Sequence, residues 1–261
     1  MFKDKSVAIT GATGGIGRAI AEMFISNGAK VAISDLKRPD DTAAQIGAIA
    51  FKCDVSDENQ IKEFIDNASA ANGAVDIFVA NAGVGFGDTG HAASASNEAW
   101  ETSWKVNVMQ SVYAARMLIP EWKARGTGRL VVTASAAGLL AQIGSASYTV
   151  TKHGAESFAE QVAFEHAADG IKANCICPQY VRTNMTKGFA MAENSPDGFL
   201  EPSDVAQALK LAITENRFLV LPHPVVGEYF KRRAVGPDEY IAGMAKLKTK
   251  VAGSSLPPKD S

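Results

Sequence analysis

Seven short apolar segments recur along the chain, and longer segments with helical periodicity separate them. Regular alternation of strands and helices predicts crossover units, in which each helix returns the chain so that the next strand runs parallel to the last. Strands of such a sheet are buried on both faces, which explains why the segments are continuously apolar. The predicted strands are 6–10, 30–34, 48–53, 75–80, 129–134, 172–177 and 218–221.

The segments between these strands predict helices on both faces of the sheet. Ser203, which follows Pro202, is the expected N-cap of the last helix. No linker rich in Pro, Gly or Ser divides the chain, so residues 1–250 are expected to form one α/β domain, a doubly wound parallel sheet of about seven strands. The predicted helices are 15–27, 57–71, 97–124, 147–168 and 203–215.

Two segments interrupt the alternation. Residues 180–201 carry scattered Met and Phe side chains among polar ones, and we expect them to form a mobile lid. Tyr229, Phe230 and Tyr240 follow the last strand with basic residues between them, which predicts a subunit interface rather than an RNA-binding patch, because the patch is short and the chain is net acidic. Residues 251–261 are expected to be a flexible tail.

The overall charge argues against a polyanionic partner. The chain has 26 Lys and Arg against 28 Asp and Glu, a net charge of −2, and no block of like charge, so binding to nucleic acid or to an anionic membrane is not supported. No apolar run has the length of a signal peptide or a membrane span, and the three cysteines match neither a disulfide framework nor a C-x-x-C metal site. We expect a cytoplasmic protein that acts on a small molecule and binds no metal.

The first predicted strand runs directly into a glycine-rich turn, TGATGGIG, that precedes an amphipathic helix. Gly11, Gly15 and Gly17 permit a tight turn and a close backbone approach, so a pyrophosphate can rest on the helix N-terminus. Asp35 follows the second predicted strand, 24 residues after Gly11, where a carboxylate would meet the adenosine ribose hydroxyls of a dinucleotide. A nucleoside-triphosphate loop would instead need Lys followed by Ser or Thr where Arg18 stands.

Asp35 also predicts which dinucleotide binds. A carboxylate bonded to the ribose 2′-hydroxyl repels a 2′-phosphate, so we expect NAD rather than NADP. Lys37 and Arg38 follow closely and could soften this preference, although solvated loop charges are the simpler account of both.

Tyr148 and Lys152 lie one helical turn apart, so their side chains share a face. Removing a hydride from a secondary alcohol also requires a base for its hydroxyl proton. A free phenol titrates near 10, and lowering its pKa by about 3 units takes roughly 4 kcal/mol. An ammonium about 4 Å away supplies a similar amount at an effective dielectric constant of about 20. We therefore expect Lys152 to ionise Tyr148, which then acts as the base.

Together these motifs resemble the short-chain dehydrogenase/reductase family over about residues 4–221. The resemblance implies a Rossmann-like fold, a homodimer or homotetramer, and a catalytic tetrad of Asn107, Ser135, Tyr148 and Lys152. In that family the serine holds the substrate oxygen and the asparagine holds a water near the lysine. Structural alternatives stay open for two of them: Ser135 as a strand-end cap, and Asn107 as a core amide that braces its helix.

The resemblance also implies the cofactor contacts. Asp54–Val55 is similar to the family's adenine contact, Asn81–Gly83 to its N-A-G turn, and Val181 and Thr183 to the positions that hold the nicotinamide carboxamide. The expected cofactor-binding residues are Gly11, Thr13, Gly14, Gly15, Ile16, Gly17, Asp35, Asp54, Val55, Asn81, Ala82, Gly83, Tyr148, Lys152, Pro178, Val181 and Thr183.

One departure from the family concerns the substrate. The family usually has Pro-Gly after the sixth strand, whereas this chain has Pro178-Gln179, and Gln179 either narrows the space over the nicotinamide or adds a polar contact. The expected pocket wall is apolar and suits a hydrophobic secondary alcohol or its ketone. The wall residues are Val84, Phe86, Leu139, Leu140, Ile143, Tyr180 and Met185, and the expected substrate-binding residues are Ser135, Leu140, Tyr148 and Gln179.

Two other functions remain open at this stage. One is an NADP-linked reductase of acyl or steroid carbonyls, which a comparison of turnover with the two cofactors would separate. The other is a non-catalytic NAD-binding regulator, against which the intact tetrad argues.

Overall fold

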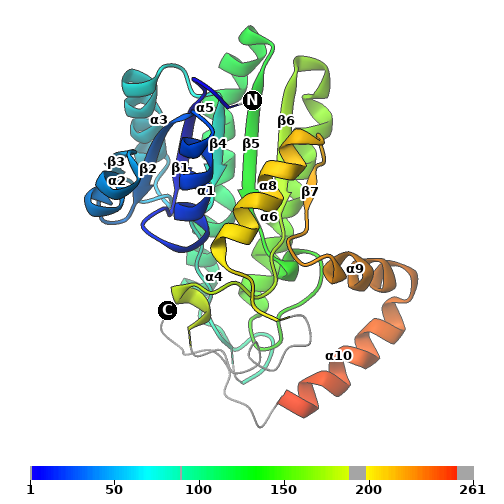
Figure 1. Cartoon of the computed structure of the whole chain (residues 1–261). Coiled ribbons are helices and arrows are strands. Elements are labelled where there is room, and N and C mark those ends of the chain that lie inside the picture. The colour runs from blue at the N-terminus through cyan, green and yellow to red at the C-terminus, as the bar shows by residue number, and fades with distance from the viewer. Residues whose placement is uncertain (1, 89, 188–197, 252–261) are drawn as a thin grey trace.

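The computed structural model describes residues 2–88, 90–187 and 198–251. Within them, seven parallel strands form one sheet in the order β3-β2-β1-β4-β5-β6-β7, and helices cover both faces (Figure 1). The predicted doubly wound, Rossmann-like fold is therefore confirmed. The strands are β1 Ser6–Thr10, β2 Lys30–Asp35, β3 Ile49–Lys52, β4 Ile77–Ala80, β5 Gly128–Thr133, β6 Ile171–Ile176 and β7 Leu219–Val220.

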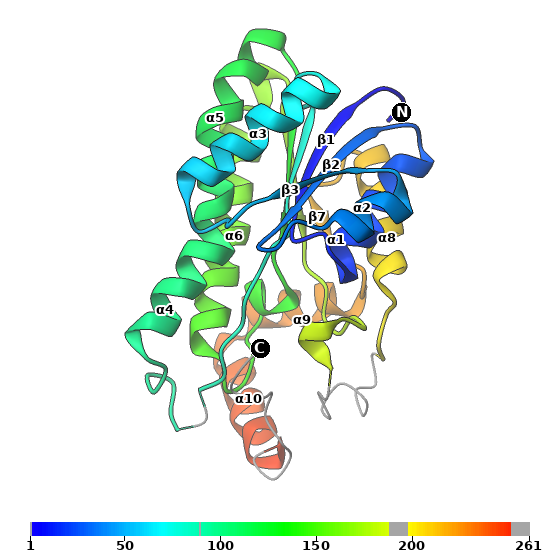
Figure 2. The same ribbon diagram turned by 90° about the vertical axis from the view of Figure 1, so that its left-hand side faces the viewer.

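Two helical layers enclose the sheet. The α-helices are α1 Gly15–Ser26, α2 Asp40–Ile46, α3 Glu58–Asn72, α4 Asn97–Trp104, α5 Gln110–Arg125, α6 Ala146–Glu165, α8 Pro202–Thr214, α9 Val225–Val235 and α10 Pro237–Val251. Figure 2 shows α3, α5 and α6 on one face of the sheet and α1 and α8 on the other, with α2 beside α1. None of the described helices is long and apolar enough to span a bilayer.

Each face of the sheet packs its own hydrophobic core. Phe64, Leu118 and Trp122 are fully buried between the sheet and the layer of α3, α5 and α6. Ile20 and Phe24 of α1 are fully buried on the other face. Because both faces are covered, the strands are apolar throughout, as the sequence pattern predicts.

The prediction for the N-terminus of α8 is wrong. The helix begins at Pro202, and its N-cap is Glu201 rather than Ser203. The Glu201 side chain accepts a hydrogen bond from the first helical turn, and its backbone N–H donates to the Asp204 carboxylate at 2.9 Å. This reciprocal capping box starts the helix earlier than a serine N-cap would.

The predicted helix 97–124 is divided in two. Lys105–Met109 form one π-helical turn between α4 and α5, so the helix carries a local bulge at Asn107. Such bulges occur often at functional sites, because the wider turn redirects a side chain out of the regular helical repeat.

The strand order places an opening at the carboxyl edge of the sheet, by which we mean the side where the carboxyl ends of all the parallel strands lie. β1 lies between β2 and β4, because the chain crosses from β3 back over the sheet to form β4. The connections that leave β1 and β4 run to opposite faces, and ligands of doubly wound folds bind in the crevice between them, at the carboxyl ends of the strands. The opposite edge holds short helix-to-strand turns with left-handed glycines, Gly73, Gly126 and Gly170, at φ values of 92°, 66° and 76°.

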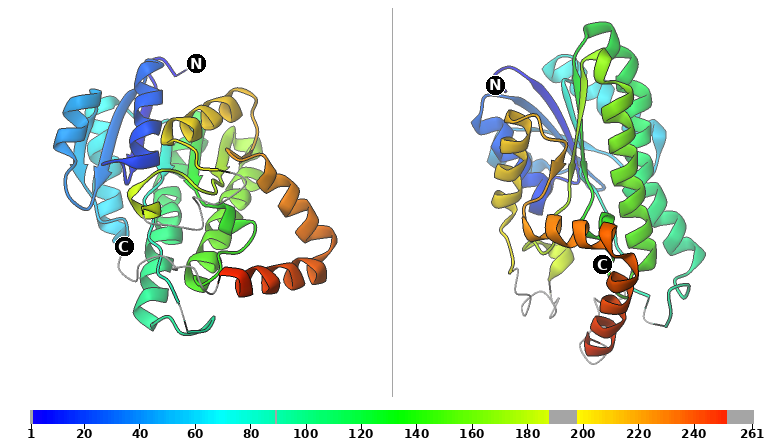
Figure 3. Two further views of the ribbon diagram at one scale, coloured as in Figure 1. Left: turned by 60° about the horizontal axis from the view of Figure 1, so that its bottom comes forward. Right: turned by 90° about the vertical axis from the view of Figure 1, so that its right-hand side faces the viewer.

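The C-terminal helices form an appendage beneath the carboxyl edge. α9 follows β7, and α10 packs against α9 and projects from the body of the molecule (Figure 3). Arg233 of α9 donates to the Leu139 carbonyl and to Nε2 of His153 at 2.8 Å, and it lies 5.7 Å from the ring centroid of Tyr240. These contacts tie the appendage to the segment that follows β5 and to α6. The predicted lid lies partly outside the described residues, and the predicted flexible tail lies outside them except for residue 251.

Candidate active site

The glycine-rich turn follows β1 at the carboxyl edge. Gly11 and Gly15 adopt φ values of 63° and 54°, which side-chain-bearing residues rarely reach. A Cβ at Gly17 would lie 2.4 Å from the Gly11 carbonyl oxygen and 2.5 Å from Nδ2 of Asn81, so this position requires glycine for packing. A Cβ at Gly14, in contrast, would meet nothing within 4 Å. The turn therefore leaves open space in front of the N-terminus of α1.

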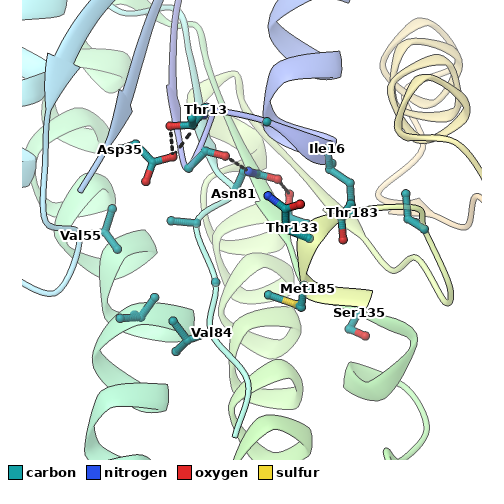
Figure 4. A pocket seen from close by; sticks show the side chains of 18 of the residues that line it. Thr13, Ile16, Asp35, Val55, Asn81, Val84, Thr133, Ser135, Thr183 and Met185 are labelled. Carbon is teal, nitrogen blue, oxygen red and sulfur yellow. Dashed lines mark hydrogen bonds between the residues drawn. The ribbon is translucent and has the colours of Figure 1, made fainter. Parts of the chain in front are cut away.

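The Asp35 carboxylate is held beside this turn at the end of β2. Its Oδ2 accepts hydrogen bonds from the backbone N–H of Thr13 at 3.2 Å and from the Thr13 hydroxyl at 2.7 Å. Its Oδ1 accepts one from the N–H of Leu36 at 2.9 Å. Figure 4 shows Asp35 and Thr13 facing each other at one end of the cavity. The carboxylate is thus oriented by the protein itself.

Asn81 joins the glycine-rich turn to β5. Its Nδ2 donates to the carbonyls of Thr10 at 3.1 Å and Gly11 at 2.9 Å, and its Oδ1 accepts from the Thr133 hydroxyl at 3.1 Å (Figure 4). Asn81 therefore connects the glycine-rich turn after β1 to the carboxyl end of β5 by hydrogen bonds.

Asn107 braces the opposite wall from the π-helical turn. The side chain is buried, its Oδ1 accepts from the N–H of Val84 at 2.9 Å, and its Nδ2 donates to the Val84 carbonyl at 2.9 Å and to the Thr151 hydroxyl at 3.0 Å. These bonds match the bracing amide that the sequence left open, and they connect the segment after β4 to the residue before Lys152. Its expected role in holding a water stays a prediction.

Tyr148, Lys152 and Ser135 meet at the other end of the carboxyl edge. Lys152 is buried, its Nζ donates to the Thr133 carbonyl at 2.9 Å, and this atom lies 5.5 Å from the ring centroid of Tyr148. Ser135 follows β5, and its hydroxyl accepts from the N–H of Ala137 at 3.1 Å. The tyrosine and lysine side chains therefore share one face, as their spacing in the sequence predicts.

The pKa of Tyr148 is raised in this structure, opposite to the expected lowering. Burial of the phenol is the main cause, and it outweighs a hydrogen bond with Ser135 that lowers the pKa. Burial also lowers the pKa of Lys152, to about 8.

A cavity of about 600 Å³ extends along the carboxyl edge from Asp35 to Ser135 (Figure 4). Three predicted site residues do not line it: Gly17 packs beneath the turn, Asn107 braces the wall, and Leu140 packs against the hydrophobic core. The predicted residues that do line it are Gly11, Thr13, Gly14, Gly15, Ile16, Asp35, Asp54, Val55, Asn81, Ala82, Gly83, Ser135, Tyr148, Lys152, Pro178, Gln179, Val181 and Thr183.

The substrate wall differs from the predicted one. Of the residues expected there, only Val84 and Met185 line the cavity, whereas Leu139 is buried in the core. Thr102 and Val106 line the cavity and were not predicted. Their spacing of four residues, just before Asn107, places them on one helical face and is the sequence signal that identifies them.

A dinucleotide fits this cavity on structural grounds. The open space at Gly14 lies at a helix N-terminus, where backbone N–H groups and the helix dipole favour a pyrophosphate. Asp35 lies at one end for a ribose, and Tyr148 lies at the other, where a nicotinamide would meet a substrate. A doubly wound sheet with these groups at its carboxyl edge is the arrangement of nicotinamide-dependent oxidoreductases.

Comparisons with known proteins agree with this class. The model of the short chain dehydrogenase family matches residues 5–194. The chain is 30% identical over 261 residues to oxidoreductase UcpA of Salmonella typhimurium, covering 97% of this chain and 95% of that protein. It is 30% identical over 230 residues to cyclohexanol dehydrogenase of an Acinetobacter species, covering 84% and 91%.

A solved structure extends the agreement to three dimensions. A short chain dehydrogenase/reductase from Burkholderia phymatum in complex with NAD superposes with a TM-score of 0.78 at 26% identity, covering 98% of each chain. The chain described here therefore belongs to the short-chain dehydrogenase/reductase family and is an oxidoreductase of that family.

Proposed function

We propose that the protein is an NAD-dependent dehydrogenase/reductase that interconverts a hydrophobic secondary alcohol and its ketone. The observation that carries this proposal is a single cavity lined by the glycine-rich turn and Asp35 at one end and by Ser135, Tyr148 and Lys152 at the other. The cyclohexanol dehydrogenase among the relatives, and the NAD in the Burkholderia structure, support the alcohol and the cofactor.

Tyr148 is the group proposed to exchange a proton with the substrate oxygen, and Ser135 holds that oxygen beside it. The bound cofactor would supply or accept the hydride, and its oxidised ring carries a positive charge that favours the phenolate. Lys152 keeps a cation beside the phenol, and Asn107 fixes the helix that carries the lysine.

The raised pKa of Tyr148 concerns its protonation state before the cofactor binds. A phenol is protonated at neutral pH at its ordinary pKa of about 10, and the raised pKa keeps Tyr148 in that form. The protonated phenol is the form that donates a proton to a carbonyl oxygen during reduction. Oxidation of an alcohol requires the phenolate, so it depends on additional positive charge at the site.

The cofactor preference rests on the surroundings of Asp35. An anion at this position disfavours a 2′-phosphate. The nearby cation Arg38 is already engaged, because its Nε donates to the Ala50 carbonyl at 3.0 Å and pairs with Asp40 at 3.3 Å. Both contacts use Nε and the ion pair is exposed, so they do not occupy the rest of the guanidinium, and the preference for NAD over NADP rests on the Asp35 carboxylate.

The test compares the wild type with Tyr148→Phe by NADH absorbance on a panel of aliphatic, aromatic and steroid alcohols and ketones. We expect the variant to lose at least about 100-fold in kcat while it still binds NAD in a calorimetric titration. Tyr113→Phe, a change on α5 away from the cavity, is the matched control. Unchanged turnover by Tyr148→Phe contradicts the proposed base, and a wild type that prefers NADPH contradicts the role of Asp35.

A further inference from the structure

Gln110, the first residue of α5, is a buried amide whose oxygen and nitrogen are both engaged. Its Oε1 accepts a hydrogen bond from the Thr10 hydroxyl at 2.8 Å. Its Nε2 donates to the carbonyls of Ala82 and Val106, both at 2.6 Å. These partners lie at the end of β1, in the turn after β4 and in the π-helical turn, so one side chain connects three separate parts of the site.

The partners of Gln110 require an amide at this position. Carbonyl oxygens only accept hydrogen bonds, so the side-chain nitrogen must face Ala82 and Val106. The Thr10 hydroxyl accepts from the backbone N–H groups of Asn81 at 3.0 Å and Ala82 at 3.2 Å, which leaves its own proton for Oε1. A carboxylate would lack the donors, and an aliphatic side chain would lack both donors and acceptor.

The segment of Ala82 runs between the glycine-rich turn and the lysine. A Cβ at Gly11 would lie 2.7 Å from Cα of Ala82, so Ala82 packs directly on the turn. A Cβ at Gly83 would lie 3.2 Å from Nζ of Lys152, so the backbone of Gly83 passes directly beside the ammonium. A displacement of Ala82 would therefore reach the groups on both sides of it.

A second amide, Asn107, holds the same segment from the π-helical turn. Asn107 bonds both backbone groups of Val84, and Gln110 bonds the carbonyl of the residue before Gly83, so Gly83 is held on either side. Gln110 also bonds the Val106 carbonyl, which in a regular α-helix would accept from the backbone N–H of residue 110. The Gln110 side chain thus joins the π-helical turn to the segment that passes the lysine.

We propose that Gln110 is a positioning residue of the active site, which holds the backbone of Gly83 against the ammonium of Lys152 and so sets where this ammonium lies relative to Tyr148. This inference rests on the proposed function and deepens it, because Lys152 is the cation beside the reacting phenol. The competing account is a core amide that contributes to stability alone. Only a positioning residue makes the lysine and the hydride transfer respond to its loss.

The first measurement follows Lys152 without turnover, by NMR of protein labelled at the ε carbon of lysine. Lys152→Arg identifies the signal by its absence. Gln110→Met keeps the length of the side chain but removes its hydrogen bonds. We expect the signal to shift and the pKa of Lys152, lowered to about 8 by burial, to rise because water reaches the ammonium. The other titratable groups beside it, Tyr148, Cys175 and Cys177, are the same in both proteins.

The second measurement is the single-turnover rate of hydride transfer, followed by NADH absorbance with enzyme and NAD in excess over the alcohol. Gln110→Met is expected to lower this rate at least about 10-fold. KM for NAD should change less than about threefold, because Asp35 and the glycine-rich turn keep their own hydrogen bonds. Gln110→Glu is the second variant. It keeps the shape and the acceptor for Thr10 without the two N–H donors, and we expect it to lower the rate as well.

Asn174→Leu is the matched control. Asn174 is a buried amide of β6 that bonds the Arg129 guanidinium and the Arg217 carbonyl, and none of these three residues lines the cavity. We expect Asn174→Leu and Gln110→Met to lose a similar amount of melting temperature, roughly 5–15 °C. In Asn174→Leu, however, the Lys152 signal should stay in place and the single-turnover rate should stay within about twofold of the wild type.

The outcomes distinguish the inference from the proposed function. An unchanged Lys152 signal in the Gln110 variants, or an unchanged rate beside an active wild type, refutes the positioning role and leaves the proposed function intact. Equal changes in Asn174→Leu would assign the effect to lost stability, which also overturns the inference. A shifted Lys152 signal in a protein that turns over no alcohol or ketone with NAD supports the positioning role and contradicts the proposed function.

Discussion

The two ends of the cavity differ in how their polar groups are satisfied. At one end, the Asp35 carboxylate accepts three hydrogen bonds from the protein, so its orientation is set in advance. At the other end, the Gln179 carbonyl accepts none from the described residues, although solvent does not reach it. The Asp35 end of the cavity is therefore held by hydrogen bonds within the protein, whereas the end near Ser135 contains a buried acceptor that has none in the described residues.

The largest expected effect comes from a substitution in the glycine-rich turn, at the end of the cavity where Asp35 lies. A methyl group at position 17 would lie far inside van der Waals distance of the Gly11 carbonyl oxygen and of Asn81, and backbone cannot move aside cheaply. We expect Gly17→Ala to cost about 3 kcal/mol of unfolding free energy, or roughly 6–12 °C in melting temperature, because the turn is overpacked. NAD affinity should fall in parallel by about 100-fold.

Gly14→Ala is the matched control for this experiment. It adds the same methyl group three residues earlier, where nothing lies within 4 Å and the backbone is extended. Thermal melts without cofactor should show little change for this variant. A similar loss of stability in both variants would contradict the assignment of the effect to overpacking at Gly17, because helix propensity alone favours alanine over glycine.

The next prediction concerns the reacting end. Burial lowers the folded-state pKa of Lys152 to about 8, below the ordinary lysine value of 10.5, so the unfolded chain binds this proton more tightly. The cost of burying the charge is fully present below pH 8 and disappears as the pH rises through 10.5. We expect the unfolding free energy of the wild type to gain about 2–3 kcal/mol relative to Lys152→Met between pH 7 and pH 10.

Urea denaturation of both proteins at intervals of one pH unit measures this difference. Lys172→Met, at an exposed lysine of β6, is the control and should show no such divergence from the wild type. Parallel curves for the wild type and Lys152→Met would show that the lysine is not held in a desolvated site.

A smaller effect is expected for cofactor choice. Asp35→Asn removes the charge but keeps the size of the side chain, so NAD loses a charge-assisted bond and a 2′-phosphate is no longer repelled. We expect kcat/KM for NAD to fall by about 10-fold to 100-fold, while the ratio of NADP to NAD use rises. Arg38→Ala should leave that ratio unchanged, because we assign the discrimination to the charge of Asp35. A shift of the ratio in Arg38→Ala instead would assign cofactor discrimination to the arginine.

The smallest expected effect lies in the C-terminal appendage. Arg233→Met keeps the aliphatic stem but removes the donors to Leu139 and His153, at an expected cost of about 1 kcal/mol of stability. Because the segment of Leu139 also carries Ser135, KM for the substrate should rise a few-fold while KM for NAD does not. Arg232→Met, at an exposed neighbour, is the control. Equal changes in both Michaelis constants would contradict a local link to the substrate end.

The sequence predicts the sheet well because each strand appears as an uninterrupted run of apolar residues. Strands buried on both faces must be apolar throughout, and every predicted strand overlaps an observed one. The helices α2, α9 and α10 were not predicted. α2 is too short to show a helical repeat of apolar residues. α9 and α10 bury few side chains, so their sequences carry no continuous apolar face.

The sequence identifies residues that the fold gathers around one cavity, but it does not give the energetics there. Spacing brings Tyr148 and Lys152 onto one face, whereas the direction of the tyrosine pKa depends on the burial of the phenol and on its hydrogen bond with Ser135. Neither is encoded in a four-residue spacing. In the same way, Leu140 follows the reacting strand in sequence, but it turns toward the core rather than the cavity.

The left-handed glycines at the far edge of the sheet have a consequence for engineering. Gly73 and Gly126 sit in turns where a Cβ would meet no neighbour, on the side of the sheet away from every group that lines the cavity. The glycines themselves must be kept, because their φ values of 92° and 66° disfavour other residues, but a tag or tethering peptide inserted beside them would lie on the side of the sheet opposite the cavity. In this parallel sheet the cavity lies at the carboxyl ends of the strands, and the turns suited to attachment lie at the amino ends.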